Sequence, residues 1–186
     1  MIEGVEMAAI AEPEPVKLFA AVLWSDEPTR RSACAAMEQH WGVIDFVGAD
    51  HPFDATNFYE PEMGPRLQRR LVAFSRLVSP EILASAKLAC IEIEAVQSEA
   101  GKRRVNLDVG YLDHNKIVLA SVKGLGQKIY LSKGIYADLV ARYGHGRYQP
   151  FEWTFPDFKT GRCDADLAQL RQIYLNQMKA HRRQSD

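Results

Sequence analysis

The chain has 186 residues, of which 47 % are hydrophobic and 25 % are charged, and its formal net charge is −1. This composition is typical of a soluble globular protein, and the balanced charge gives no general attraction to nucleic acid or to an anionic membrane. No apolar run approaches the roughly 20 residues of a membrane span, and no CxxC pair indicates a zinc knuckle or a disulfide framework, so we expect a cytoplasmic protein.

The first 15 residues, MIEGVEMAAIAEPEP, are acidic and lack the basic and long apolar regions of a secretory signal. The alternation of Glu and Pro over residues 12–15 is typical of a segment without stable structure. We therefore predict a flexible acidic tail over residues 1–15 and a single α+β domain over residues 16–186.

Four segments of the chain have patterns typical of β-strands. The first is a short continuous apolar run, and the last alternates polar and apolar residues. The third is also compatible with a helix, although we favour a strand. In chain order the four segments are residues 16–24, 43–47, 67–78 and 103–111.

Two helices are predicted between these strands. Ser25 and Asp26 offer an N-cap for the first helix, and Gly42 is suited to end it. The second helix begins at residues 79–81, Ser-Pro-Glu, and is predicted to end at Gly101. Its buried stripe is predicted to consist of Ile82, Ala86, Ala89, Ile93 and Val96.

The resulting order β-α-β-β-α-β is that of the split, ferredoxin-like arrangement. It predicts an α+β fold in which two helices cover one face of an antiparallel sheet. The other face of the sheet would then need a cover or a ligand.

The rest of the chain is predicted to extend this core. Residues 116–122 are compatible with a strand or a short helix, and residues 127–131 and 135–143 are predicted strands. Residues 143–148 indicate a tight hairpin. A last helix begins at Asp164 or Asp166 and carries Leu167, Leu170, Tyr174 and Met178 at helical spacing. We thus expect a C-terminal β-hairpin extension followed by a terminal helix.

Several segments together resemble an uncharacterised prokaryotic family, catalogued as domain of unknown function 4416. They are PVKLF (15–19), PFDATNFYEPEMGP (52–65), KRRVNLDVGYL (102–112), KIYLSKGIYADL (128–139) and FEWTFPDF (151–158). The resemblance implies no established activity or substrate. Some members carry a GTP-binding label, but this sequence has no GxxxxGK[ST] loop to hold a triphosphate. The family's Thr after Phe-Asp is also displaced here, because Ala55 precedes Thr56.

The alternating strand is the first candidate site. Its polar face carries Arg104, Asn106 and Asp108, while Tyr111 lies in register with the apolar face. Arg suits a carboxylate or phosphate, Asn both donates and accepts, and Asp can act as a base. Gly110 indicates a bulge or a close backbone approach. The alternatives are a solvated face and a structural Arg–Asp salt bridge.

Residues 48–65 are predicted to form a long loop, and its segment over residues 52–64 is the second candidate. Its length exceeds that of a tight connection, and its aromatic and acidic residues favour a loop folded over the open sheet face. Tyr59 and Glu60 are its candidates for a function. Asp54 is another, although it is equally suited to form a turn.

Two further stretches contribute candidates. Lys123 begins a Lys-Gly-Leu-Gly stretch that could hold a phosphate or could be a plain turn. Trp153 and Asp157 lie in the aromatic loop over residues 151–158, where a core anchor is the alternative to ligand stacking.

The first hypothesis is a binding module for a small anionic ligand, such as a nucleotide or a phosphorylated metabolite. Arg104 and Lys123 would bind the anion, Asn106 would orient it, and Tyr59 or Trp153 would stack on it. The remaining ligand-binding candidates are Asp54, Tyr111 and Asp157.

Two other classes of function stay open. An acid–base enzyme would use Asp108 and Glu60 as paired carboxylates, with Arg104 stabilising negative charge. An RNA-binding module would use aromatic side chains on the sheet, but the near-zero net charge and the lack of an aromatic RNP-type run argue against it. The scattered histidines have no HxxxH or HExxH spacing, so no metal site is predicted. Cofactor and oligomeric state are left open.

Overall fold

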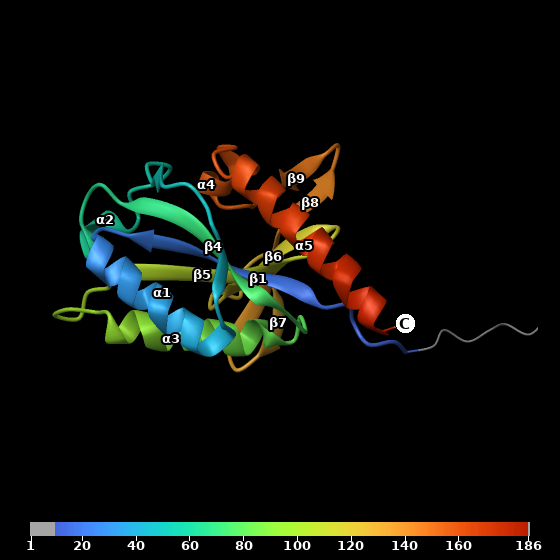
Figure 1. Cartoon of the computed structure of the whole chain (residues 1–186). Coiled ribbons are helices and arrows are strands. Elements are labelled where there is room, and N and C mark those ends of the chain that lie inside the picture. The colour runs from blue at the N-terminus through green and yellow to red at the C-terminus, as the bar shows by residue number, and fades with distance from the viewer. Residues whose placement is uncertain (1–9, 186) are drawn as a thin grey trace, which may run out of the picture.

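The computed structural model describes residues 10–185, which form one large antiparallel sheet with helices on both sides (Figure 1). The strands are β1 (Val16–Trp24), β2 (Ile44–Val47), β3 (His51–Pro52), β4 (Gln68–Val78), β5 (Val105–Leu112), β6 (Lys116–Ser121), β7 (Ile129–Ser132), β8 (Ile135–Gly144) and β9 (Arg147–Pro150). The helices are α1 (Glu27–Trp41), α2 (Glu60–Met63), α3 (Ile82–Val96), α4 (Pro156–Lys159) and α5 (Asp164–Ser185).

The predicted α+β class is confirmed, with a large antiparallel sheet and a terminal helix. The nine strands follow the order β2-β4-β1-β5-β6-β8-β7, with β3 paired to β4 and β9 paired to β8. The C-terminal strands therefore continue the same sheet, and β8 and β9 form the tight hairpin that was predicted over residues 143–148. The sheet is larger than a four-stranded ferredoxin-like sheet and its order differs, so the ferredoxin-like topology stays a prediction.

Several predicted elements differ from the observed ones. Residues 48–65 contain the short strand β3 and the single helical turn α2, where one long loop was expected. Residues 116–121 are a strand, which decides between the two alternatives. The second long helix ends at Val96 instead of continuing to Gly101, and Val96 itself is exposed. Of the predicted stripe, Ala86 and Ile93 are buried, and the charged residues Lys87 and Glu94 that follow them are buried as well.

The predicted acidic tail is only partly described, because residues 1–9 lie outside the described residues. Residues 10–15 form neither helix nor strand. Glu14 is paired with Arg182 of α5, and the Tyr174 hydroxyl donates to the carbonyl oxygen of Pro15 at 3.2 Å. This part of the chain therefore lies along α5 just before β1 begins.

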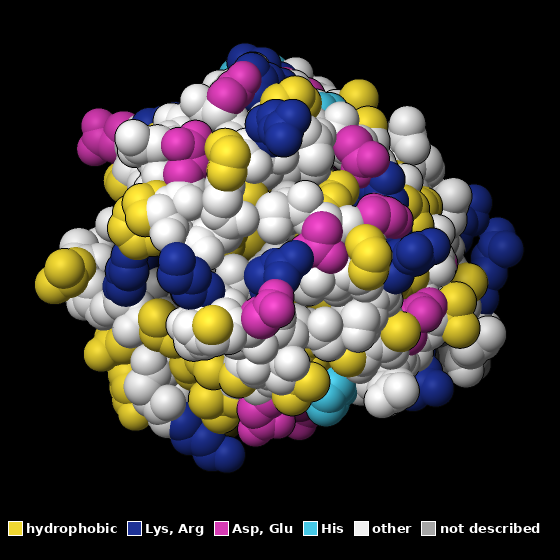
Figure 2. All heavy atoms as spheres, turned by 90° about the vertical axis from the view of Figure 1, so that its left-hand side faces the viewer, with side chains coloured by type: hydrophobic (Ala, Val, Ile, Leu, Met, Phe, Trp, Pro, Cys, Tyr) yellow, Lys and Arg dark blue, Asp and Glu magenta, His cyan; other side chains and the backbone are white. Residues whose placement is uncertain are grey.

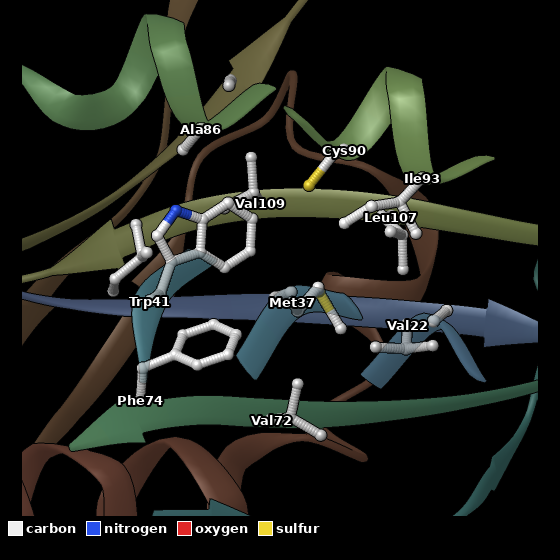
Figure 3. Close-up of a cluster of buried hydrophobic side chains, with 14 of the residues drawn as sticks. Val22, Met37, Trp41, Val72, Phe74, Ala86, Cys90, Ile93, Leu107 and Val109 are labelled. Atoms are coloured by element: carbon white, nitrogen blue, oxygen red, sulfur yellow. The ribbon is translucent and has the colours of Figure 1, made fainter. Parts of the chain in front are cut away.

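One face of the sheet packs against α1 and α3, which run side by side (Figure 1). Asp26 accepts a hydrogen bond from the Thr29 amide at 2.9 Å, so it is the N-cap of α1 that the sequence predicted. The ring of Trp41 meets that of Phe74 edge-on at 5.0 Å, in the middle of the buried cluster that Figure 3 shows. Met37 and Cys90 fill the space between the two helices and the strands (Figure 3).

The opposite face packs against α5. The apolar positions of this helix recur at helical spacing and are all buried, as the sequence predicted: Leu167, Leu170, Tyr174 and Met178. They lie against β1 and β4, where Phe19 and Leu71 are fully buried. Because α1 and α3 cover one face and α5 covers the other, all nine residues of β1 are buried. Within residues 10–185, no helix has both the length and the apolar character needed to cross a bilayer.

Gly110 provides a test of how closely β5 and β6 approach. A Cβ atom at this position would lie 2.6 Å from Cδ2 of Leu119 and would also clash with the Val118 carbonyl oxygen. We expect Gly110→Ala to lower the free energy of unfolding by about 1–3 kcal/mol, because overpacking forces neighbouring atoms to move. Urea denaturation measures this change.

Gly144→Ala is the matched control, because the nearest atom to an added Cβ there is Oε1 of Gln149 at 3.6 Å, an ordinary contact. Its effect should stay within about 0.5 kcal/mol. Equal effects of the two substitutions would contradict the close approach.

Candidate functional site

The site begins with a break in strand pairing along β5. β5 pairs with β1 along its whole length, but it pairs with β6 only from Gly110 to Leu112. The amide of Leu107 therefore donates to Oε1 of Glu94 at 2.6 Å, and its carbonyl accepts from Nζ of Lys87 at 2.7 Å. Buried backbone groups need such partners, so two side chains of α3 take the place of a neighbouring strand.

A cavity of about 400 Å³ lies where β5 and β6 separate, and we call it the β5–β6 cleft. This volume is within the range of small-molecule sites, about 300–1,000 Å³. It is lined by Phe58, Tyr59, Lys87, Ile91, Glu94, Arg103, Asn106, Asp108, Leu119, Ala120, Ser121, Val122, Lys123, Lys128 and Phe155.

The polar and apolar lining residues are separated by depth. Lys87, Glu94 and Asn106 are buried, and the Asp108 side chain is 23 % exposed. Phe58 and Phe155, in contrast, are 62 % and 44 % exposed. The cleft thus has a polar floor and an apolar mouth, which is a common design for small-molecule sites.

Most cations at the cleft are already paired. Arg103 donates to both carboxylate oxygens of Glu62, at 2.9 and 2.7 Å, and to Oδ1 of Asn106 at 2.9 Å. Nζ of Lys128 lies 3.5 Å from the Asp138 carboxylate. Nζ of Lys123 lies 4.9 Å from the centre of the Phe58 ring, and no described carboxylate lies within 4.0 Å of it.

Asn106 contributes an unused hydrogen-bond donor to the floor. Its Oδ1 accepts from Arg103, which fixes the orientation of the amide. Its Nδ2 is buried and has no hydrogen-bond partner among the described residues. Since an unsatisfied buried donor costs about 1–3 kcal/mol, an acceptor supplied from the cleft would be stabilised there.

Behind the floor, Arg69 of β4 connects two carboxylates. Its guanidinium donates to Asp108 at 2.5 Å and also to Asp157 of α4. The rings of Phe53 and Phe158 lie 5.0 and 5.7 Å from the guanidinium carbon. Arg69 therefore holds Asp108 in place and ties α4, together with the loop that carries Phe155, to the sheet.

Burial shifts the protonation of two lining residues. Burial raises the pKa of the Glu94 carboxyl above its ordinary value of 4.5, while the neighbouring Lys87 opposes that shift. Burial also raises the pKa of Tyr59 to about 12, so this phenol is neutral at physiological pH.

Four of the residues that the sequence predicted for a site line the cleft together. They are Tyr59, Asn106, Asp108 and Lys123. Asp157 does not line it but adjoins it through Arg69. The expected convergence of the polar strand with the loops over 52–64 and 151–158 is thus found in part, through Phe58, Tyr59 and Phe155.

The other predicted site residues lie elsewhere. Arg104 precedes β5 and forms structural ion pairs with Asp26 and Glu99. It does not line the cleft. On the face of the molecule that Figure 2 shows, Lys and Arg side chains are interspersed with Asp and Glu. Glu60 is exposed and borders a different surface depression, because α2 turns it away from Asp108.

Asp54, Tyr111 and Trp153 also lie outside the cleft lining. Asp54 pairs with Arg162 at 2.6 Å on the surface. Tyr111 packs against the core beneath α3, as its place on the apolar face of the strand requires. Trp153 stacks on Phe151 at 4.8 Å and donates to the carbonyl oxygen of Leu139, so it ties its loop to β8, although it is 42 % exposed and lies outside the buried clusters.

Sequence reasoning missed Arg69, Lys87, Glu94 and Arg103. Lys87 and Glu94 carry a usable signal, because residues seven positions apart lie on the same face of a helix and both interrupt an apolar helix. Arg69 could not be identified, since β4 contains three arginines and only the tertiary pairing distinguishes the one that is buried.

Replacing Arg69 tests its role as a connector. Arg69→Met should lower the free energy of unfolding by about 3 kcal/mol or more, because two carboxylates lose their shared partner. Arg70→Met is the control on the opposite face of the same strand, where the pair with Asp50 is exposed and should contribute about 0–1 kcal/mol. Urea denaturation of both variants at neutral pH measures the difference. Similar losses would show that the buried network adds nothing.

The raised pKa of Glu94 predicts a specific pH dependence. A carboxyl with a raised pKa in the folded state stabilises the fold fully below its unfolded value, near 4.5, and that contribution is lost as the pH rises through the folded pKa. Glu94→Gln keeps an acceptor for the Leu107 amide but cannot ionise. We expect the wild type to lose stability relative to this variant as the pH rises above 4.5.

The control for this titration is Glu92→Gln, because Glu92 is exposed on the same helix. Melting curves of the three proteins between acidic and neutral pH measure the effect. A constant difference between the wild type and Glu94→Gln across that range would refute the assigned protonation behaviour.

The comparisons with known proteins agree with the sequence resemblance. No curated protein and no solved structure matches the chain. A family model does match, over residues 14–174, which span β1 to the middle of α5. The chain therefore belongs to the family described as Domain of unknown function (DUF4416).

Proposed function

We propose that this protein is a binding module for a small anionic ligand, held in the β5–β6 cleft. The observation that carries the proposal is the position of the Lys123 ammonium group at the cleft mouth. Among the described residues, its one interaction is with the ring of Phe58. A charge-assisted hydrogen bond to an anion is stronger than a neutral one, so this ammonium group is suited to a ligand.

The roles of the other residues follow from their positions. Arg103 lines the cleft where Arg104 had been expected to do so. Its charge is balanced by Glu62, so its role is to orient Asn106 and not to bind the anion. Tyr59 lies beneath Arg103, with the guanidinium carbon 5.7 Å from the ring centre, and provides an apolar wall. Nucleotides, phosphorylated metabolites and carboxylates are the ligand classes to test.

A second candidate function is acid–base catalysis by two carboxylates of the floor. Asp108 keeps its predicted place, and Glu94 replaces Glu60 as its partner, because both line the cleft. Burial raises the pKa of Glu94, which suits it to act as the acid, while Asp108 is the carboxylate that accepts a hydrogen bond from Arg69. Incubating the protein with any ligand found, and following that ligand by NMR, tests this candidate. Conversion that Glu94→Gln abolishes would support it, and an unchanged ligand would refute it.

The RNA-binding alternative gains no support from the arrangement of the sheet. Stacking of bases on a ferredoxin-like sheet needs an open aromatic face, whereas α1, α3 and α5 cover the two faces of this sheet. We further propose that β2, β4, β1 and β5 with α1 and α3 form a ferredoxin-like unit within the larger sheet, a proposal that the chain order β-α-β-β-α-β supports.

A thermal-shift panel tests the binding proposal. A ligand present at about a hundred times its dissociation constant should stabilise the wild type by about 2.7 kcal/mol, which is several degrees of melting temperature. We expect Lys123→Ala to lose this shift. Lys179→Ala, an exposed lysine on α5, should retain it. The proposal fails if no anion in the panel shifts the melt, or if Lys123→Ala responds as the wild type does.

A further inference from the structure

We infer that the ligand of the β5–β6 cleft carries one negative charge on an apolar body, as an aryl or alkyl carboxylate does, and is not a polyphosphate. This inference rests on the proposed function and narrows it to a chemical class. It is carried by the balance of charge around the cleft, by the packing of the glycine stretch, and by the apolar mouth.

The balance of charge leaves one cation for a ligand. Four cations line the cleft, and three of them have a carboxylate nearby: Lys87 has Asp108 at 4.0 Å, Arg103 has Glu62 at 2.7 Å and Lys128 has Asp138 at 3.5 Å. Only Lys123 is left over among the described lining residues.

The floor of the cleft also disfavours further negative charge. Glu94 and Asp108 both lie there, and neither the buried Glu94 nor the half-buried Asp108 has an unused cation beside it. The second and third charges of a polyphosphate would face these carboxylates without compensation, and like charges repel strongly in a partly desolvated site.

The first two residues of the Lys-Gly-Leu-Gly stretch are engaged in the packing of the fold. A Cβ atom on Gly124 would lie 2.6 Å from Cε1 of Tyr136, so the glycine is needed for the close approach of this ring. The amide of Lys123 is already used, because it donates to Oγ of Ser121 at 3.1 Å. The Lys123 amide and the Gly124 position thus have structural partners within the fold, whereas a glycine-rich phosphate loop leaves its first amides free for the ligand.

The mouth of the cleft is suited to an apolar body. Four large hydrophobic side chains from four parts of the chain surround it and are exposed: Phe58, Ile91, Val122 and Phe155. Contiguous exposed apolar surface of this kind marks binding sites, because water leaves it at a gain in free energy. The unused Nδ2 of Asn106 below can donate to one oxygen of the ligand.

The test compares three kinds of probe on the full chain, with calorimetry or NMR titration as the readout. The first is a series of monocarboxylates: benzoate, phenylacetate, 3-phenylpropionate and hexanoate. The second is the neutral amide of each acid, and the third is inorganic phosphate, AMP and ATP. We expect at least one carboxylate to bind more tightly than the phosphates. Its amide should bind about tenfold or more weakly, as the loss of a charge-assisted hydrogen bond predicts.

Variants identify the source of the charge preference. Lys123→Ala should bring the carboxylate and its amide to equal affinity, whereas Lys123→Arg and the control Lys179→Ala should keep the difference. Lys123 and Lys179 are both exposed, so neither substitution should prevent folding.

The possible failures separate the two proposals. If AMP or ATP binds and no carboxylate does, the single-charge inference is overturned while the anion-binding function stands. Equal binding of acid and amide to the wild type would also overturn the inference. If no probe of any class binds, both the inference and the proposed function fall.

Discussion

The backbone of Leu107 sets the constraint on which the site depends. Its amide and carbonyl are buried on the side of β5 where β6 does not pair with it, and such groups must find partners. α3 supplies them through Glu94 and Lys87, which is why an otherwise apolar helix carries two buried charges. With these hydrogen bonds made, β5 and β6 can separate along the part of β5 that precedes Gly110, and the gap between them becomes the cleft.

The same constraint explains why so little charge is free. Burying a cation is costly unless a carboxylate accompanies it, so each ammonium or guanidinium group near the floor has acquired an acidic neighbour. Arg69 serves two such acids and thereby joins β4, β5 and α4 behind the floor. Lys123 needs no acidic neighbour because it lies at the exposed mouth, where water and the Phe58 ring stabilise its charge. Whether a cation is available to a ligand thus depends on how deeply that cation is buried in the cleft.

The sequence predicted what local patterns control. The apolar run of β1, the N-cap Asp26 and the stripe on α5 were correctly identified because spacing and residue type decide them. The close approach at Gly110 was also anticipated. The site was found only in part, because ion pairing across the fold is not encoded locally. Arg103 and Arg104 are neighbours with the same chemistry, and only the turn before β5 sends one to the cleft and the other to Asp26.

The packing of α5 on β1 has a consequence for the order of folding. Phe19 and Leu71 emerge early during synthesis, but their cover comes from residues Leu167 to Met178, about 150 positions after β1. One face of the sheet can therefore assemble with α1 and α3 while the other stays bare until the chain is nearly complete. Contacts that span so much of the sequence slow folding. The nascent protein thus passes through a stage in which an apolar sheet surface faces water, and chaperones that recognise such surfaces have their best opportunity then.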